Sequence, residues 1–249
     1  MFEWLSFASG IVSVQFNTAR HDLGLGYCES ADEYTFEHDA LRQRVSTELA
    51  RFTMIWGALE LLTGIICLDF QAPRKFAKVN GKINAACIFL GKYGSETPLP
   101  PGYLDELYAL HLALIHDSPD QFKQAIHRHR KRAPRPFVGL RSLGLDAVYS
   151  LRNDFAHGSF GIPDPSSELT AGGTAAVIAS SSRIVLFSVQ MLLAARLQQR
   201  GLANEELDAM LDVSLDDQHG ASAADVIGNL HLEHSPKRRR SLSSQVGAP

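Results

Sequence analysis

Residues 36–68 read FEHDALRQRVSTELARFTMIWGALELLTGIICL, and this stretch decides the fold. It holds no proline, and its only glycines are Gly57 and Gly64. Its apolar residues recur at steps of three, four or seven: Leu41, Val45, Leu49, Phe52, Trp56, Leu59 and Ile66. This spacing predicts a long helix with one face to bury, either continuous or broken near Gly64.

Similar periodicity, flanked by proline and glycine, predicts five further helices. They are expected to run from Pro73 to about Leu90, from Tyr103 to Ile115, from Ser118 to about Arg132, from Leu140 to His157, and from about Leu169 to Arg200. Gly91 is interpreted as the end of the first of these helices, and the pair Gly172 and Gly173 suggests that the last helix starts later than Leu169. The sequence therefore predicts an all-α bundle of five or six helices.

The two ends of the chain differ from this helical body. Residues 1–35 form a short mixed extension, in which the weak alternation of residues 11–16 suggests a short strand. The helical domain is expected to span residues 36–203. Residues 204–249 turn acidic, then basic at residues 237–240, and are expected to be a disordered tail.

Composition narrows the class of protein and of site. The chain has 249 residues and a formal net charge of −3, so contact with a nucleic acid would have to come from a local basic patch. Cys28, Cys67 and Cys87 lie far apart and lack the spacing of zinc ligands. We expect buried thiols in a reducing compartment, no metal site and no cofactor.

The apolar run from Phe52 to Leu68 is the strongest candidate for a membrane segment. It is short for a span and contains Glu60, so it is interpreted as a core helix. The N-terminus carries Glu3 where a secretory signal would carry a basic residue. A cytoplasmic protein without membrane attachment is therefore expected.

The segment that carries chemistry is residues 149–158, YSLRNDFAHG. Leu151 and Phe155 fall on an apolar stripe with Leu140, Leu143 and Ala147, which should fix this helix against the core. Asn153 and His157 are four apart and share a face. Arg152 is five residues before His157, so only a relaxed last turn or a second subunit would bring the two into one cleft.

These residue types suit cleavage of RNA without a metal ion. Histidine can take a proton from a ribose 2′-hydroxyl or give one to the leaving oxygen. Arginine offers a rigid fork of donors to a phosphate that gathers negative charge. Because the 2′-hydroxyl lies beside the scissile phosphate, no metal-bound water is required.

The segment resembles the signature of the HEPN superfamily, which is an arginine, four intervening residues and a histidine, with a polar residue directly after the arginine. The run LRNDFAHG at residues 151–158 is similar to that of apea-like HEPN proteins, and WGALELL at residues 56–62 resembles their first core helix. The resemblance covers roughly residues 36–200.

The resemblance implies a HEPN-like helical bundle acting as a homodimeric, metal-independent endoribonuclease, of the kind used in toxin or defence systems with an antitoxin or defence-system partner. Arg152 would bind the phosphate, His157 would act as acid or base, and Asn153 would hold His157 or the RNA. Some HEPN toxins carry a modifiable tyrosine two residues after the histidine. Here Ser159 stands in that place, which puts such regulation in doubt.

Other readings of these residues remain open. Arg152 and Asp154 could be surface charges, with His157 capping the helix, and the fold could be a catalytically inactive module that binds RNA, a nucleotide or a protein. Glu60 and Asp154 are candidate supporting residues. Glu60 would pair with Arg152 or steady His157 across the bundle, or would be an ordinary surface carboxylate. A candidate RNA-binding run holds Arg128, Arg130, Lys131 and Arg132, though a solvated basic helix end would have the same composition.

Overall fold

The computed structural model describes residues 1–15, 29–67, 81–94, 97–116, 138–157 and 173–200. Within these ranges the regular structure is entirely helical, which confirms the predicted all-α class. The helices are α1 (Phe2–Gly10), α2 (Glu29–Ile66), α3 (Lys82–Tyr93), α4 (Tyr103–His116), α6 (Leu140–Ala156) and α7 (Thr174–Arg200).

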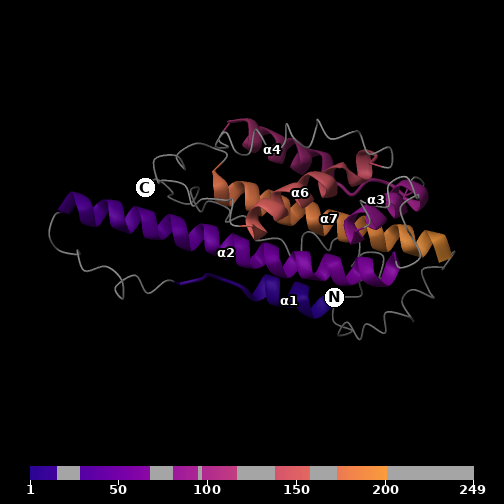
Figure 1. The fold of residues 1–249 in the computed structure, drawn as a ribbon, viewed down its shortest axis with the longest axis horizontal. Helices are drawn as coiled ribbons and strands as arrows, with labels where there is room; N and C mark the ends of the chain where they lie inside the picture. The colour runs from indigo at the N-terminus through magenta and orange to yellow at the C-terminus, as the bar shows by residue number, and fades with distance from the viewer. Residues whose placement is uncertain (16–28, 68–80, 95–96, 117–137, 158–172, 201–249) are drawn as a thin grey trace, which may run out of the picture.

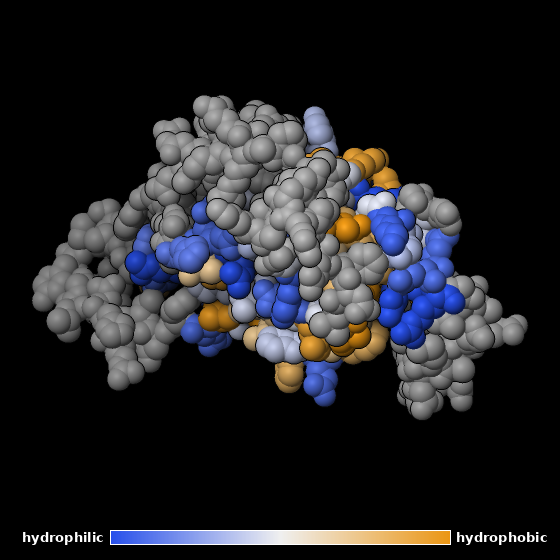
Figure 2. Space-filling model, turned by 45° about the vertical axis from the view of Figure 1, so that its right-hand side comes forward, coloured by the Kyte–Doolittle hydropathy of each residue, from blue (hydrophilic) through white to orange (hydrophobic). Residues whose placement is uncertain are grey.

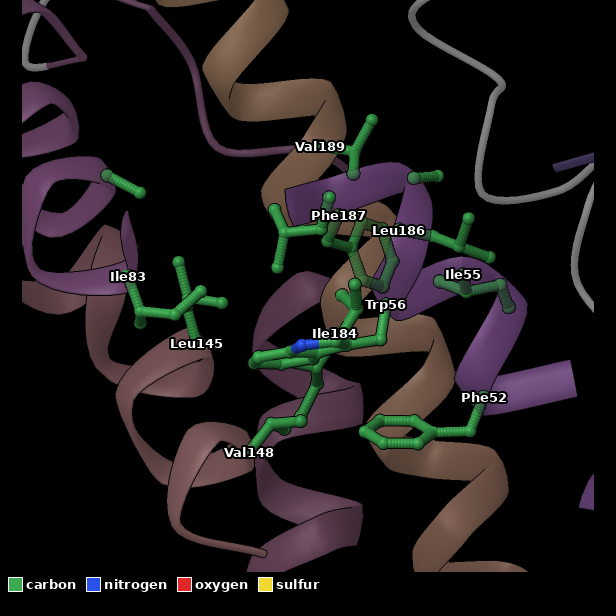
Figure 3. Packing of buried hydrophobic residues seen from close by; sticks show 14 of the residues in the cluster. Phe52, Ile55, Trp56, Ile83, Leu145, Val148, Ile184, Leu186, Phe187 and Val189 are labelled. Atoms are coloured by element: carbon green, nitrogen blue, oxygen red, sulfur yellow. The ribbon is translucent and has the colours of Figure 1, made fainter. Parts of the chain in front are cut away.

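The two longest helices, α2 and α7, pack along each other and form the spine of the molecule (Figure 1). The short helix α1 lies along α2, while α4 packs on α7. Helices α3 and α6 pack on each other and on α7. The core between these layers is drawn in Figure 3, where Trp56 extends from α2 toward Val148 of α6.

Helix α2 is a single uninterrupted helix that begins at Glu29, seven residues before the predicted start. It passes through both Gly57 and Gly64, which settles the alternative left open by the sequence. The predicted apolar face is confirmed: of its seven residues all are buried except Leu49, which is half-buried. Burial of this continuous stripe stabilises the helix through the two glycines.

Helix α7 is buried along most of its length because its polar residues are small and bonded within the helix. The hydroxyls of Ser181, Ser182 and Ser188 donate to the carbonyl oxygens four residues earlier, at 2.8–3.0 Å. Their hydrogen-bonding groups are therefore satisfied without water. The helix starts at Thr174, directly after Gly173, as the delayed start predicted.

The predicted strand in residues 11–16 is wrong for the described part. Phe2–Gly10 is helical, and residues 11–15 have no regular structure but lie along α2. The guanidinium of Arg51 donates to the carbonyl of Ile11 at 2.7 and 3.0 Å, and the amide of Val14 donates to Thr47 Oγ1 at 2.9 Å. Side chains of a helix thus satisfy backbone groups that a strand would pair.

The apolar stripe predicted on α6 is wrong in its first half. Leu140 and Leu143 are 53% and 43% exposed, whereas Leu145, Val148 and Leu151 are buried. The reason lies at Gly144, where an added Cβ would come 2.7 Å from Ile184 of α7. The face with the smallest residue allows the closest approach of α7, and close packing outweighs the periodicity of the leucines.

A buried tyrosine joins α4 to this end of α6. The phenol of Tyr103 donates to the carbonyl of Leu140 at 3.1 Å and accepts from the amide of Gly144 at 3.1 Å. A second tie joins α4 to α7, where Arg183 approaches both oxygens of Glu106 at 2.7 Å. These polar contacts fix the position of α4 relative to α6 and α7.

Some predicted boundaries moved or fall outside the described residues. Gly91 does not end α3, which continues to Tyr93; the amide of Gly94 then caps the carbonyl of Leu90 at 2.9 Å. The predicted helix beginning at Ser118, the predicted start at Pro73 of the helix that contains α3, and the tail lie outside the described residues. Cys67 and Cys87 are buried, as predicted, and form no disulfide, while Cys28 lies outside the described residues.

Two helices are long and apolar enough to cross a membrane by length and composition: residues Phe36–Ile66 of α2 and all of α7. In α7, 78% of the apolar window is buried inside the bundle, and in α2 the share is 44%. The test is one that core helices of soluble proteins also pass, so the absence of membrane attachment and the cytoplasmic location stay predictions.

Candidate functional site

The motif lies on the last two turns of α6, as the sequence predicted. Leu151 is buried, and the ring of Phe155 meets that of Phe52 of α2 edge to face, with centroids 5.6 Å apart. These two apolar anchors fix the rotation of the helix about its axis. Arg152 is consequently directed toward α2, where it meets Glu60, and His157 at the end of the motif is exposed.

Arg152 meets Glu60 of α2, which is the pairing that the sequence suggested. Its Nη2 lies 3.8 Å from Glu60 Oε1, and its guanidinium carbon lies 5.8 Å from the ring centroid of Trp56. The indole N–H of Trp56 donates to the same Glu60 oxygen at 2.7 Å. Tyr149, one turn before Arg152, stacks nearly parallel on Trp56, with centroids 6.3 Å apart.

The ion pair between Arg152 and Glu60 is loose. The two side chains are 36% and 40% exposed, and 3.8 Å is long for a charge-assisted hydrogen bond. Exposed pairs of this kind contribute about 0–1 kcal/mol to stability. Exchanging the carboxylate for an incoming phosphate would therefore cost little, and the aromatic support under the guanidinium would remain.

His157 is exposed and is the C-terminal cap of α6. Its amide donates to the carbonyl of Asn153 at 3.0 Å, so the helical hydrogen bond is kept to the end. The relaxed last turn that would carry His157 toward Arg152 is not present. In a regular helix, residues five apart lie about 140° apart around the axis, so one chain does not place Arg152 and His157 side by side.

The remaining predicted site residues divide into two groups. Asn153 and Asp154 are half-buried on α6 beside Arg152. Arg128, Arg130, Lys131 and Arg132 lie outside the described residues, as does Ser159. Across the part of the chain that the structure describes, no three histidine, cysteine, aspartate or glutamate side chains gather in a way that could hold a metal ion.

Two residues around Arg152 were missed by sequence reasoning. In the sequence, Trp56 stands out only as part of an apolar face and of a run that resembles the HEPN family, and Tyr149 only as part of residues 149–158. The spacing of Trp56 and Glu60, four apart on one helix, was a signal that the pair would be neighbours. The stacking of Tyr149 depends on the crossing of two distant helices and left no local signal.

No family model, no curated protein and no solved structure matches this chain.

Proposed function

We propose that this protein is a HEPN-type endoribonuclease that cuts RNA without a metal ion. The observation that supports the proposal most is the supported, half-exposed guanidinium of Arg152, which rests on Trp56 and is held only loosely by Glu60. A phosphodiester that displaces the carboxylate would find a rigid fork of donors in place. His157 is exposed on the same helix, within the motif that resembles the HEPN signature.

In the proposed reaction the 2′-hydroxyl of the ribose attacks the adjacent phosphorus as His157 takes its proton. The bond from phosphorus to the 5′-oxygen breaks, and that oxygen takes a proton from the imidazolium of His157 as it leaves. The products are a 2′,3′-cyclic phosphate and a 5′-hydroxyl end. Arg152 stabilises the charge that builds up on the phosphate, and Asn153, one helical turn before His157, orients the imidazole or the RNA.

The proposal includes a homodimer. Since Arg152 and His157 diverge around α6, the complete site would be formed where two copies of the motif face one cleft. Arg152 of one copy and His157 of the other would then reach the same phosphate. A toxin or defence setting, with an antitoxin or defence-system partner in the cytoplasm, is part of the same proposal and rests on the resemblance alone.

One observation favours a second candidate, a catalytically inactive module that binds RNA, a nucleotide or a protein. Within one chain Arg152 is already paired, though loosely, with Glu60, and residues five apart such as Arg152 and His157 lie about 140° apart around the helix axis. Such a site would recognise a phosphate without supplying the proton transfer that cleavage needs. Binding with no product would favour this candidate.

The deciding experiment incubates mixed RNA with the protein in EDTA and identifies the fragment ends. Wild type should leave 2′,3′-cyclic phosphates, while Arg152→Ala and His157→Ala should lower the rate at least a hundredfold. Arg42→Ala is the matched control, because Arg42 is an exposed α2 arginine paired only loosely with Asp39, at 3.6 Å. Cleavage that survives in both motif variants, with thermal melts showing a folded protein, would rule the proposal out.

A further inference from the structure

Trp4 of α1 packs directly on α2, one turn before Glu60 of the candidate site. Its ring carbons Cε3 and Cζ3 would lie 2.9 and 3.0 Å from a Cβ built on Gly57, so the indole occupies a place where only glycine leaves room. Gly57 adjoins Trp56 in the sequence, and Glu60 follows one turn later. Residues three apart on a helix have Cβ atoms about 5–6 Å apart, so Trp4 contacts the α2 turn that leads to Glu60, the ion-pair partner of Arg152.

The packing of Trp4 on α2 is a specific feature of the fold. A glycine inside a helix costs about 1 kcal/mol relative to alanine, and Gly57 lies in the middle of α2. On one side of Trp4 in α1, Leu5 and Ala8 are buried against the bundle. Farther along, Arg51 holds the carbonyl of Ile11. The indole is therefore seated at a fixed place, while 41% of the residue stays exposed.

Trp4 is an exposed aromatic residue, and the α2 turn that it contacts leads to Glu60, the ion-pair partner of Arg152. Figure 2 shows one face of the molecule, on which hydrophobic areas lie among hydrophilic ones. Phe7 is also exposed but lies one turn nearer the end of α1 that Arg51 holds, away from Glu60.

We propose that Trp4 is a base-stacking residue that adjoins the candidate RNA site. The inference rests on the proposed function: when Arg152 holds a phosphate, the base of the adjoining nucleotide stacks on the exposed indole. Stacking on an aromatic face with an arginine on the backbone is how proteins hold single strands without reading their sequence. A paired base in a duplex has no free face to offer, so duplex RNA binds more weakly.

The test measures binding apart from cleavage. A short fluorescent oligouridine with 2′-O-methyl groups, which block the attacking hydroxyl, is titrated with the intact chain and followed by anisotropy. Trp4→Leu keeps the apolar contact with Gly57 but has no ring, and should weaken binding about tenfold, the cost of losing one stacked base. Trp4→Tyr keeps a ring and should bind within about threefold of wild type. Phe7→Ala, on the same helix, should bind as wild type does.

Tryptophan fluorescence supplies a second readout, because the chain has only two tryptophans and Trp56 is 5% exposed. The oligonucleotide should quench a larger share of the wild-type emission than of the Trp4→Tyr emission, which comes from Trp56 alone. A purely structural role of Trp4 would not produce this difference.

Equal affinity of Trp4→Leu and wild type overturns the inference, and so does equal weakening in Trp4→Leu and Trp4→Tyr. A wild type that does not bind the oligonucleotide overturns it as well. The nuclease proposal is judged separately by cleavage in EDTA. If Trp4→Leu alone weakens binding but wild type cuts no RNA, the stacking inference is supported and the nuclease proposal is wrong. If wild type cuts RNA but Trp4→Leu binds as tightly as wild type, the nuclease proposal is supported and the stacking inference is wrong.

Discussion

The indole N–H of Trp56 holds Glu60 at 2.7 Å through the same oxygen that Arg152 approaches at 3.8 Å. The carboxylate is thus positioned by its own helix, one turn away, before α6 contributes anything. Arg152 is the movable partner of the group, because its guanidinium is attached more weakly than the carboxylate. A ligand with a negative charge would therefore displace the carboxylate from Arg152 without disturbing α2.

Glu60→Gln should strengthen RNA binding. Glutamine keeps an oxygen that accepts from the indole of Trp56 but removes the charge that competes with phosphate for Arg152. We expect the dissociation constant for the 2′-O-methyl oligouridine to fall about threefold to tenfold at low salt, and the free energy of unfolding to change by less than about 1 kcal/mol. Weaker binding in this variant would show that Glu60 presents Arg152 to the ligand rather than competing with it.

Gly144→Ala should destabilise the fold although alanine is the better helix former. The new Cβ would meet Ile184 at 2.7 Å and the phenol oxygen of Tyr103 at 3.0 Å. Overpacking of this kind costs about 1–3 kcal/mol, measured as the free energy of unfolding in urea.

Gly64→Ala is the matched control, because a Cβ there meets nothing within 4 Å. It should stabilise the protein by up to about 1 kcal/mol. A Gly144→Ala protein as stable as the Gly64→Ala protein would mean that α6 and α7 do not approach as closely as described.

The Cys67 thiol should make stability depend on alkaline pH. Burial raises its pKa from the usual 9.0 to about 12, with Arg196 partly opposing the rise. The folded state thus keeps a proton that the unfolded chain loses above about pH 9. The stability from this group is fully present below pH 9 and is lost as the pH rises toward 12.

Unfolding of wild type and Cys67→Ala should be compared across this pH range. The difference between their free energies of unfolding should narrow above pH 9, by at most about 1.4 kcal/mol per pH unit. Parallel curves would contradict the burial of this thiol in the folded state.

Arg51→Ala should loosen the N-terminal segment. The change removes both hydrogen bonds to the carbonyl of Ile11 and leaves the half-buried Glu48 without its partner at 2.6 Å. We expect faster hydrogen exchange at Val14 and through α1, and a loss of about 1–3 kcal/mol of stability. Arg42→Ala, on the exposed side of the same helix, should leave the exchange of residues 1–15 unchanged.

The sequence predicted the long helices well because their apolar residues recur with the period of a helix. The faces of α2 and the start of α7 followed from this periodicity and from Gly173. The buried face of α6 did not, since Gly144 and its neighbours on α7 decide it, and no local pattern carries that information. Helix α1 was missed because only two of its residues, Leu5 and Ala8, are buried and give no readable stripe.

The candidate site was predicted in its parts but not in its arrangement. The sequence indicated the motif on α6 and the partner Glu60, because charge and spacing are visible along one chain. It could not indicate that Trp56 and Tyr149 would stack around Arg152, or that Trp4 would sit on Gly57. Those contacts depend on how three helices cross. Whether Arg152 and His157 act on RNA stays a prediction for the cleavage assay.

The attachment of residues 11–15 has a consequence for how freely this chain can vary. Arg51 and Thr47 bind the main chain of Ile11, Val12 and Val14, and make no hydrogen bond to their side chains. Almost any residue except proline offers the same carbonyls and amides. Substitutions in residues 11–15 should thus be tolerated, whereas a change at Arg51 should detach the segment from α2. Selection on the attachment of this segment therefore acts mainly on one side chain of α2.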